Sequence, residues 1–263
     1  MKLVKILIYL YLLVFAIEPI CAFAHFPFKQ YRVEDGLSHN TVWCGLQDRY
    51  GFIWFGTSDG LNRYDGRGNK VYRNVLSEDF SLENNFIETL LEEGQNIWIG
   101  TSSGIYIYDY VTDRFSRFDK TTDYGVLISS EVKKIVKAKD GKLWIATLGQ
   151  GFFVYDPQKN SLIQNSMFTS FFWDICVGED GKIYMVSLQE GLLCFDEEGN
   201  LLQTYKVLDE EDSKHPDGHK INCVQCIEGD IWVGADVNRV YRLNKRQGRL
   251  DIFSSAMNLG AVR

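Results

Sequence analysis

The stretch IWFGTSDGLNRYD at residues 53–65 decides the fold of this chain, because it recurs along the sequence. It returns as IWIGTSSGIYIYD at residues 97–109, and then as LWIAT and GFFVYD within residues 143–156. Two weaker copies lie within residues 183–196 and 231–244. The aromatic anchors of the copies are 44, 46, 40 and 48 residues apart: Trp54, Trp98, Trp144, Tyr184 and Trp232. A period of this length indicates a repeat architecture.

Each repeat predicts four short strands. In the first repeat these cover residues 41–46, 52–57, 61–64 and 71–73, with glycine at the turns, where it reaches positive φ without steric cost. Short, evenly spaced strands with one Trp and one Gly per unit are typical of a β-propeller, so we expect an all-β fold of five four-stranded blades. The blades are expected near residues 34–74, 75–118, 119–164, 165–205 and 206–253.

The recurring residues of the repeat are expected to be structural. The anchor tryptophans fit between neighbouring blades, where buried aromatic rings dominate core energetics. Asp65, Asp109, Asp156 and Asp196 recur at one blade position and suit turn formation. The Gly-x-Ser-x-Gly pattern at residues 56–60 and 100–104 lies between two strands, whereas a serine hydrolase needs it on a strand-to-helix elbow.

The first 24 residues have the layout of a secretory signal peptide. Lys2 and Lys5 precede an apolar run over residues 6–17, and the Ala22-Phe23-Ala24 stretch offers a cleavage site. The run is short for a membrane span, so an uncleaved anchor is the less favoured alternative. Residues 25–263 would then form the propeller domain, with no further membrane span.

Composition excludes some partners and a disulfide framework. The formal charge is −7, and it becomes −8 without Lys2, Lys5 and Glu18, so neither nucleic acid nor an anionic membrane is expected as a partner. Five cysteines remain after residue 24, an odd number. They are expected to be small buried residues, although an exported domain leaves room for one disulfide.

The ends of the repeat array predict an open ring. Residues 28–33 resemble the fourth strand of a blade, yet the fifth repeat already has its own fourth strand at residues 250–253. A closed propeller often completes its last blade with an N-terminal strand. The count therefore predicts an incomplete ring, with blade edges that native proteins normally cover.

One family resemblance spans nearly all of residues 28–253. The stretch DGLSHNTV at residues 35–42, followed by DRYGFIWFGTSDGLNRYDG at residues 48–66, resembles two-component regulator propellers. The first two repeats match closely, the third well, and the last two loosely, since Tyr184 replaces Trp and the fifth lacks the glycine between its second and third strands. These propellers are periplasmic sensor regions of hybrid two-component systems.

The resemblance implies a periplasmic module that detects an oligosaccharide. In longer relatives a second propeller, a β-sandwich, a membrane helix and a histidine kinase follow, and this chain carries no kinase motif. We therefore expect a non-enzymatic sensor module without a cofactor. Two alternatives stay open: a scaffold for protein–protein interaction, and a propeller lyase or hydrolase acting on carbohydrate.

The expected ligand face collects the loops between blades and those between second and third strands. Polar side chains with nearby aromatic rings suit a sugar, which needs hydrogen bonds and stacking surfaces. The expected ligand-binding residues are His39, Asn40, Ser58, Asp59, Ser102, Ser103, Gln150, Trp173, Gln189 and Arg239. A metal at His215 and His219 is not favoured, because four ligands are not visible there and Cys223 and Cys226 fall on opposite faces of a strand.

Overall fold

The computed structural model describes residues 29–75, 81–165, 171–206, 220–236 and 239–253. The described residues from Arg32 onward form one compact unit. The expected signal peptide, and the loop that carries His215 and His219, lie outside the described residues. No helix in the described part of the chain has the length and apolar character to cross a lipid bilayer.

The unit consists of five antiparallel sheets, each made of four strands in chain order. The first sheet has β1 (Val42–Gln47), β2 (Ile53–Thr57), β3 (Gly60–Tyr64) and β4 (Asn69–Tyr72), and the second has β5 (Ile87–Glu93), β6 (Asn96–Thr101), β7 (Gly104–Asp109) and β8 (Arg114–Arg117). The third has β9 (Val132–Lys137), β10 (Leu143–Thr147), β11 (Phe152–Asp156) and β12 (Ser161–Asn165). The fourth has β13 (Phe172–Val177), β14 (Ile183–Ser187), β15 (Gly191–Phe195) and β16 (Leu201–Tyr205), and the fifth has β17 (Ile221–Ile227), β18 (Asp230–Ala235), β19 (Val240–Asn244) and β20 (Arg249–Ile252). We call these sheets the first to fifth blades.

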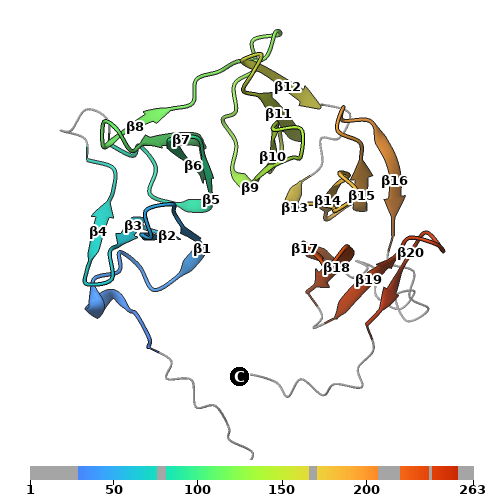
Figure 1. Cartoon of the computed structure of the whole chain (residues 1–263), viewed down its shortest axis with the longest axis horizontal. Helices are drawn as coiled ribbons and strands as arrows, with labels where there is room; N and C mark the ends of the chain where they lie inside the picture. The colour runs from blue at the N-terminus through green and yellow to red at the C-terminus, as the bar shows by residue number, and fades with distance from the viewer. Residues whose placement is uncertain (1–28, 76–80, 166–170, 207–219, 237–238, 254–263) are drawn as a thin grey trace, which may run out of the picture. The chain divides into compact units, whose positions relative to one another are not determined.

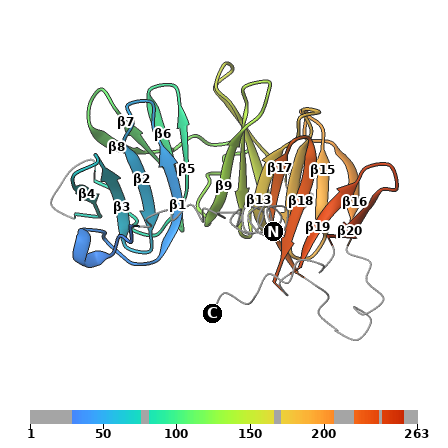
Figure 2. The same ribbon diagram turned by 60° about the horizontal axis from the view of Figure 1, so that its bottom comes forward.

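The blades follow one another around an arc, with their first strands on its inner side (Figure 1). Each first strand contacts the first strand of the next blade, from β1 and β5 through to β13 and β17. In Figure 2 the strands of all five blades run roughly from top to bottom. Within the described residues, no apolar cluster joins the fifth blade to the first. The predicted all-β propeller of five blades in an open ring is confirmed.

The core lies between blades, as the repeat predicts. One apolar cluster joins the first and second blades and contains Trp54 and Tyr108. Similar clusters join the second blade to the third, the third to the fourth and the fourth to the fifth. Trp54, Trp144 and Tyr184 are at most 1% exposed. A blade thus buries its apolar face only against its neighbour, which explains why the anchor aromatic recurs once per blade.

The glycine of the second strand lets the next blade approach closely. A Cβ added at Gly100 would lie 2.8 Å from Val132 Cγ1 of the third blade and 2.5 Å from Thr89 Cγ2. At Gly56 the same atom would lie 2.7 Å from Ile87 Cγ2 of the second blade. Distances this short do not occur between carbon atoms that are not bonded to each other, so only glycine fits the backbone as it stands.

One expected strand is wrong. Residues 29–32 of the segment expected as a strand over 28–33 belong to no strand, and Val33–Asp35 form a 3-10 turn (η1) instead. The Val33 N–H donates to Asn40 Oδ1 at 3.0 Å, and Gly36 closes the turn at φ +96°. An extended segment becomes a strand only where a neighbouring strand shares its backbone hydrogen bonds, and no strand of the described part of the chain pairs with residues 29–32.

Candidate functional site

Every inner strand carries a β-bulge at the same place, near its N-terminal end. In β1 the pairing with β2 passes from Val42–Thr57 to Cys44–Gly56 and skips Trp43. The corresponding skips occur in β5, β9, β13 and β17. We call the five skipped residues the bulge residues: Trp43, Glu88, Lys133, Trp173 and Asn222. A bulge leaves its extra residue outside the ladder and often re-aims a side chain beside a functional site.

Lys133 joins the bulge residues of four blades. Its Nζ lies 2.7 Å from Glu88 Oε2 of the second blade and 3.1 Å from Glu131 Oε1. The same ammonium lies 4.9 Å from the ring centre of Trp173 in the fourth blade and 5.8 Å from that of Trp43 in the first. Both rings are within the range of a cation–π contact. Side chains that are far apart in sequence thus meet around one buried cation.

Burial makes the charged groups of this cluster costly in free energy. The side chains of Glu88 and Lys133 are 5% and 11% exposed. Burial raises the pKa of the Glu88 carboxyl, the Lys133 ammonium opposes that rise, and the nearby Glu131 carboxyl adds to it. A buried ion pair costs desolvation on both sides, and well-packed apolar residues would often serve stability as well. Such a cluster is therefore a candidate functional site on physical grounds.

A second ion pair continues the cluster toward the fifth blade. Lys134 Nζ lies 3.8 Å from Asp174 Oδ1, and Asp174 Oδ2 accepts the Val224 N–H at 2.9 Å. Burial raises the pKa of Asp174, while Lys134 acts in the opposite direction. The bulge residues and their ion-pair partners therefore contribute three carboxylates and two ammonium groups: Glu88, Glu131 and Asp174 against Lys133 and Lys134. This local balance is one negative charge.

Trp43 gives the cluster an accessible aromatic surface. The side chain is 50% exposed, in contrast with the buried Trp54 of the same hairpin. Its Nε1–H donates to Ser58 Oγ at 2.8 Å, and its ring lies 5.6 Å from that of Phe86. Trp173 is half-buried, and its Nε1 has no hydrogen-bond partner among the described residues. An orientated, half-exposed ring beside charged groups can stack on a ligand.

Several of the predicted site residues are engaged in holding loops. His39 Nδ1 accepts the Thr41 N–H at 3.0 Å. The Asn40 side chain accepts the Val33 N–H, as described above. Asp59 pairs with Arg73 at 3.1 Å and accepts from Asn85 Nδ2 at 3.1 Å. These side chains fix the loops of the first blade, and their role in binding stays a prediction.

Predicted site residues of the later blades also take part in hydrogen bonds within loops. Asn84 donates to the hydroxyls of Ser102 and Ser103 at 3.0 and 2.9 Å. Gln150 accepts the N–H groups of Ser129 and Ser130, both at 2.9 Å. Gln189 is exposed and Arg239 is half-buried. Of the ten predicted residues, Trp173 contacts Lys133, and Ser58 contributes by fixing Trp43.

Sequence reasoning missed Trp43, Glu88 and Lys133. Each follows a residue that begins an inner strand, as in Val42-Trp43, Ile87-Glu88 and Val132-Lys133. The signal was a position that changes from blade to blade directly after a residue that is apolar in every blade: Val42, Ile87, Val132, Phe172 and Ile221. The sequence analysis placed the ligand-binding residues in loops, because loops usually carry function.

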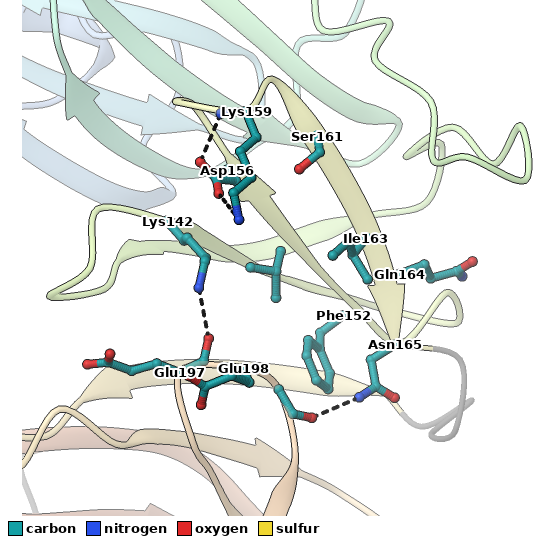
Figure 3. Close-up of a pocket in the computed structure, with 12 residues that line it drawn as sticks. Lys142, Phe152, Asp156, Lys159, Ser161, Ile163, Gln164, Asn165, Glu197 and Glu198 are labelled. Atoms are coloured by element: carbon teal, nitrogen blue, oxygen red, sulfur yellow. Dashed lines mark hydrogen bonds and ion pairs between the residues drawn. The ribbon is translucent and has the colours of Figure 1, made fainter.

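A groove between the third and fourth blades is a second candidate (Figure 3). It has a volume of about 490 Å³ and lies between β11, β12 and the turn at Glu197–Gly199. Apolar side chains of Phe152, Val154 and Ile163 line it together with polar groups. Lys142 Nζ is already paired with Asp140 Oδ2 at 2.6 Å and with Glu197 O at 3.3 Å. The volume suits a small ligand, but two blades alone contribute to it.

The other motifs behave as structural features. Ser58 and Ser102 stand in strand–turn–strand segments, and the preceding Thr57 and Thr101 donate to the carbonyls of Gly60 and Gly104 at 2.8 and 2.9 Å. Among the described residues, no group of three His, Cys, Asp or Glu side chains could hold a metal ion. Five described cysteines are free thiols: Cys176 and Cys194 are buried as expected, Cys44 and Cys226 are half-buried, and Cys223 is exposed.

Comparison with known proteins agrees with the repeat reading. Residues 36–59 match the family described as "Two component regulator propeller". A 59-residue segment of the chain is 42% identical to histidine kinase P4 of Formosa agariphila. The segment covers 22% of this chain and 4% of that protein. The predicted resemblance to two-component regulator propeller repeats is confirmed.

Solved structures share the fold. An extracellular domain of a protein described as a hybrid two-component system from B. thetaiotaomicron superposes with a TM-score of 0.71 at 24% identity, over 85% of this chain and 31% of that one. A streptogramin B lyase superposes with a TM-score of 0.63 at 14% identity, over 85% of this chain and 71% of that one. At these identities the likeness shows the propeller fold alone. The chain spans less than a third of the histidine kinase and of the extracellular domain that it resembles.

Proposed function

Because the chain carries two-component regulator propeller repeats, we propose that it is the ligand-sensing module of a hybrid two-component sensor. The observation that carries this proposal is the agreement between the matched repeat at residues 36–59 and the five-blade fold. The module would work outside the cytoplasm, in the periplasm, after export through the N-terminal segment. It would relay binding to a kinase in the longer protein and perform no chemistry itself.

We further propose that the ligand is an oligosaccharide. The half-exposed Trp43 and the half-buried Trp173 offer ring faces, and carboxylates beside them offer hydrogen-bond acceptors. Sugars need both kinds of contact, since a pyranose has apolar faces and a rim of hydroxyl groups. The described residues around Lys133 come from four blades, so a ligand there would contact several blades at once.

Isothermal titration of the chain with a panel of defined oligosaccharides tests the proposal. We expect saturable heat with at least one member, and no change in the size of any oligosaccharide after prolonged incubation. Absence of heat across the panel would contradict ligand sensing by this module. Shortened oligosaccharides would favour the alternative of a propeller lyase or hydrolase, which the streptogramin B lyase shares in fold only.

A further inference from the structure

We infer that the bulge residues form a site for an uncharged oligosaccharide, bound by Trp43 and Trp173 around a fixed Lys133. This inference rests on the proposed function and narrows its ligand class. It also moves the site from the loops, where the sequence places it, to the inner strands.

The position of the bulges supports one shared site. All five occur where the inner strand pairs with the C-terminal end of the second strand, the end that leads into the turns at Ser58 and Ser102. Backbone geometry is therefore the same in each blade, while the skipped residue changes from Trp to Glu, Lys, Trp and Asn. A position that needed only to complete the fold would be expected to keep one residue type, as the anchor aromatic does, with Trp in four blades and Tyr184 in the other. Variation at a fixed geometry is what a site with different ligand contacts requires.

Lys133 is held in place and has little freedom to bind a ligand acid. Two carboxylate oxygens lie at 2.7 and 3.1 Å from its Nζ, and two indole rings lie over the same group. An ammonium has three hydrogens to donate, and two of them are used by Glu88 and Glu131. Its role is to position the two rings and to compensate the buried carboxylates.

The charge around the bulge residues disfavours an acidic sugar. Glu88, Glu131 and Asp174 outnumber Lys133 and Lys134 by one, and every one of these five groups is already paired. A uronate carboxylate placed here would meet like charge in a partly buried setting, where screening is weak. Hydroxyl groups carry no such penalty and can donate to the carboxylate oxygens. The site thus selects uncharged sugars by repulsion as well as by contact.

Titration calorimetry of the full chain with matched glycans tests this inference. The uncharged probes are xylohexaose, cellohexaose and mannohexaose, and the acidic probes are the hexamers of galacturonate and guluronate. We expect at least one uncharged probe to bind, and Trp43→Ala to weaken it at least tenfold. Trp43→Phe, which keeps a ring but loses the bond to Ser58, should stay within a few-fold of the unaltered chain. Tyr50→Ala is the control, because Tyr50 is 61% exposed at the other end of the same hairpin.

The outcomes separate the site from the function. Uncharged binding that Trp43→Ala weakens and Tyr50→Ala does not weaken supports the inference. Binding of an acidic hexamer as tightly as any uncharged one overturns it and leaves the proposed function standing. Uncharged binding that Trp43→Ala leaves unaltered overturns the site alone. Failure of every probe to bind overturns the proposed oligosaccharide function itself, and the inference with it.

Discussion

The two ends of the inner strands differ in what repeats. At the bulge end the skipped residue is Trp, Glu, Lys, Trp and Asn in successive blades. At the opposite end, strands one and two of the first, third and fourth blades are joined by one kind of turn, closed by Gly51, Gly141 and Gly181 at positive φ. The first of these turns contains Asp48, which accepts hydrogen bonds from the backbone N–H groups of Tyr50 and Phe52 and from Trp54 Nε1.

The difference separates positions that hold the fold from positions whose residue type is free to vary. Positions that repeat in residue type hold a blade to itself or to its neighbour, as Trp54 and Gly100 do. Positions that repeat only in geometry are released from that duty and can differ from blade to blade. The bulge leaves its residue outside the ladder, so its side chain can vary without loss of strand pairing.

The largest effect should come from exchanging the two tryptophans of the first hairpin for alanine, one at a time. Trp54 is fully buried at the boundary of the first two blades, so Trp54→Ala should lower the free energy of unfolding by about 3–5 kcal/mol. Trp43 is half exposed, so Trp43→Ala should cost about 1 kcal/mol or less. Denaturant unfolding followed by circular dichroism measures both. Equal losses of unfolding free energy would contradict the distinction between Trp54, which holds two blades together, and the bulge residue Trp43.

The turn end should be the next most sensitive. Asp48→Ala removes the acceptor of four donors, including the Tyr110 hydroxyl at 3.0 Å, and should cost about 3 kcal/mol because the buried donors lose their partner. Asp140→Ala is the control in the corresponding turn of the third blade, where Ala138 holds the place of Asp48. Asp140 accepts one backbone N–H and pairs with the partly exposed Lys142, so its loss should cost about 1 kcal/mol. Thermal unfolding of both variants is the measurement, and a greater loss for Asp140→Ala would refute the expectation.

Close approach between blades can be tested with one methyl group. Gly100→Ala would place Cβ against Thr89 and Val132, and the strain should cost about 1–3 kcal/mol. Gly68→Ala serves as the control, because nothing lies within 4 Å of the added atom. Its unfolding midpoint should stay the same or rise slightly, since alanine restricts the unfolded chain. A Gly100→Ala variant as stable as Gly68→Ala would show that the blades can move apart at no cost.

The fold was predictable because its determinants repeat. One Trp, one Gly and one turn per unit define a blade, and the five copies fix the number of blades without any distant contact being known. The strand expected over residues 28–33 failed for the opposite reason, since it required a partner strand that the repeat did not supply. Local pattern predicts a strand only when a neighbour is also present.

The site was less predictable because it is assembled across blades. Lys133 and Trp43 are 90 positions apart by their numbers, and only the arc of blades brings the ammonium within 5.8 Å of the ring. The loop residues predicted from sequence are polar for a local reason: Gln150 and Ser102, for example, bind neighbouring loop groups. Trp173 was chosen as an exposed ring near a loop, and its half-buried place beside Lys133 comes from the bulge in β13.

The last prediction changes no side chain and compares one position in two blades. Cys44 and Cys223 each follow the bulge residue of their inner strand. Cys44 lies against Gly56 beside Ile87 of the next blade, and burial raises the pKa of its thiol to about 12. Cys223 is exposed. Because the thiolate is the nucleophile, alkylation at pH 8 should reach the exposed Cys223 quickly and Cys44 at least about a hundredfold more slowly.

Iodoacetamide labelling of the native chain, followed by peptide mass spectrometry, measures both rates in one sample. Urea-unfolded chain provides the control, in which the two thiols should react alike because burial is lost. The direction of the difference in labelling rate follows from the raised pKa. At pH 8 the thiol of the folded Cys44 is protonated, and the two rates would converge only at a pH well above the ordinary pKa of a thiol. Equal labelling in the native chain would mean that the second blade does not cover the first at the bulge end. Slow labelling of Cys44 together with fast labelling of Cys223 would show that packing by the next blade decides how reactive a cysteine is at the position after the bulge residue.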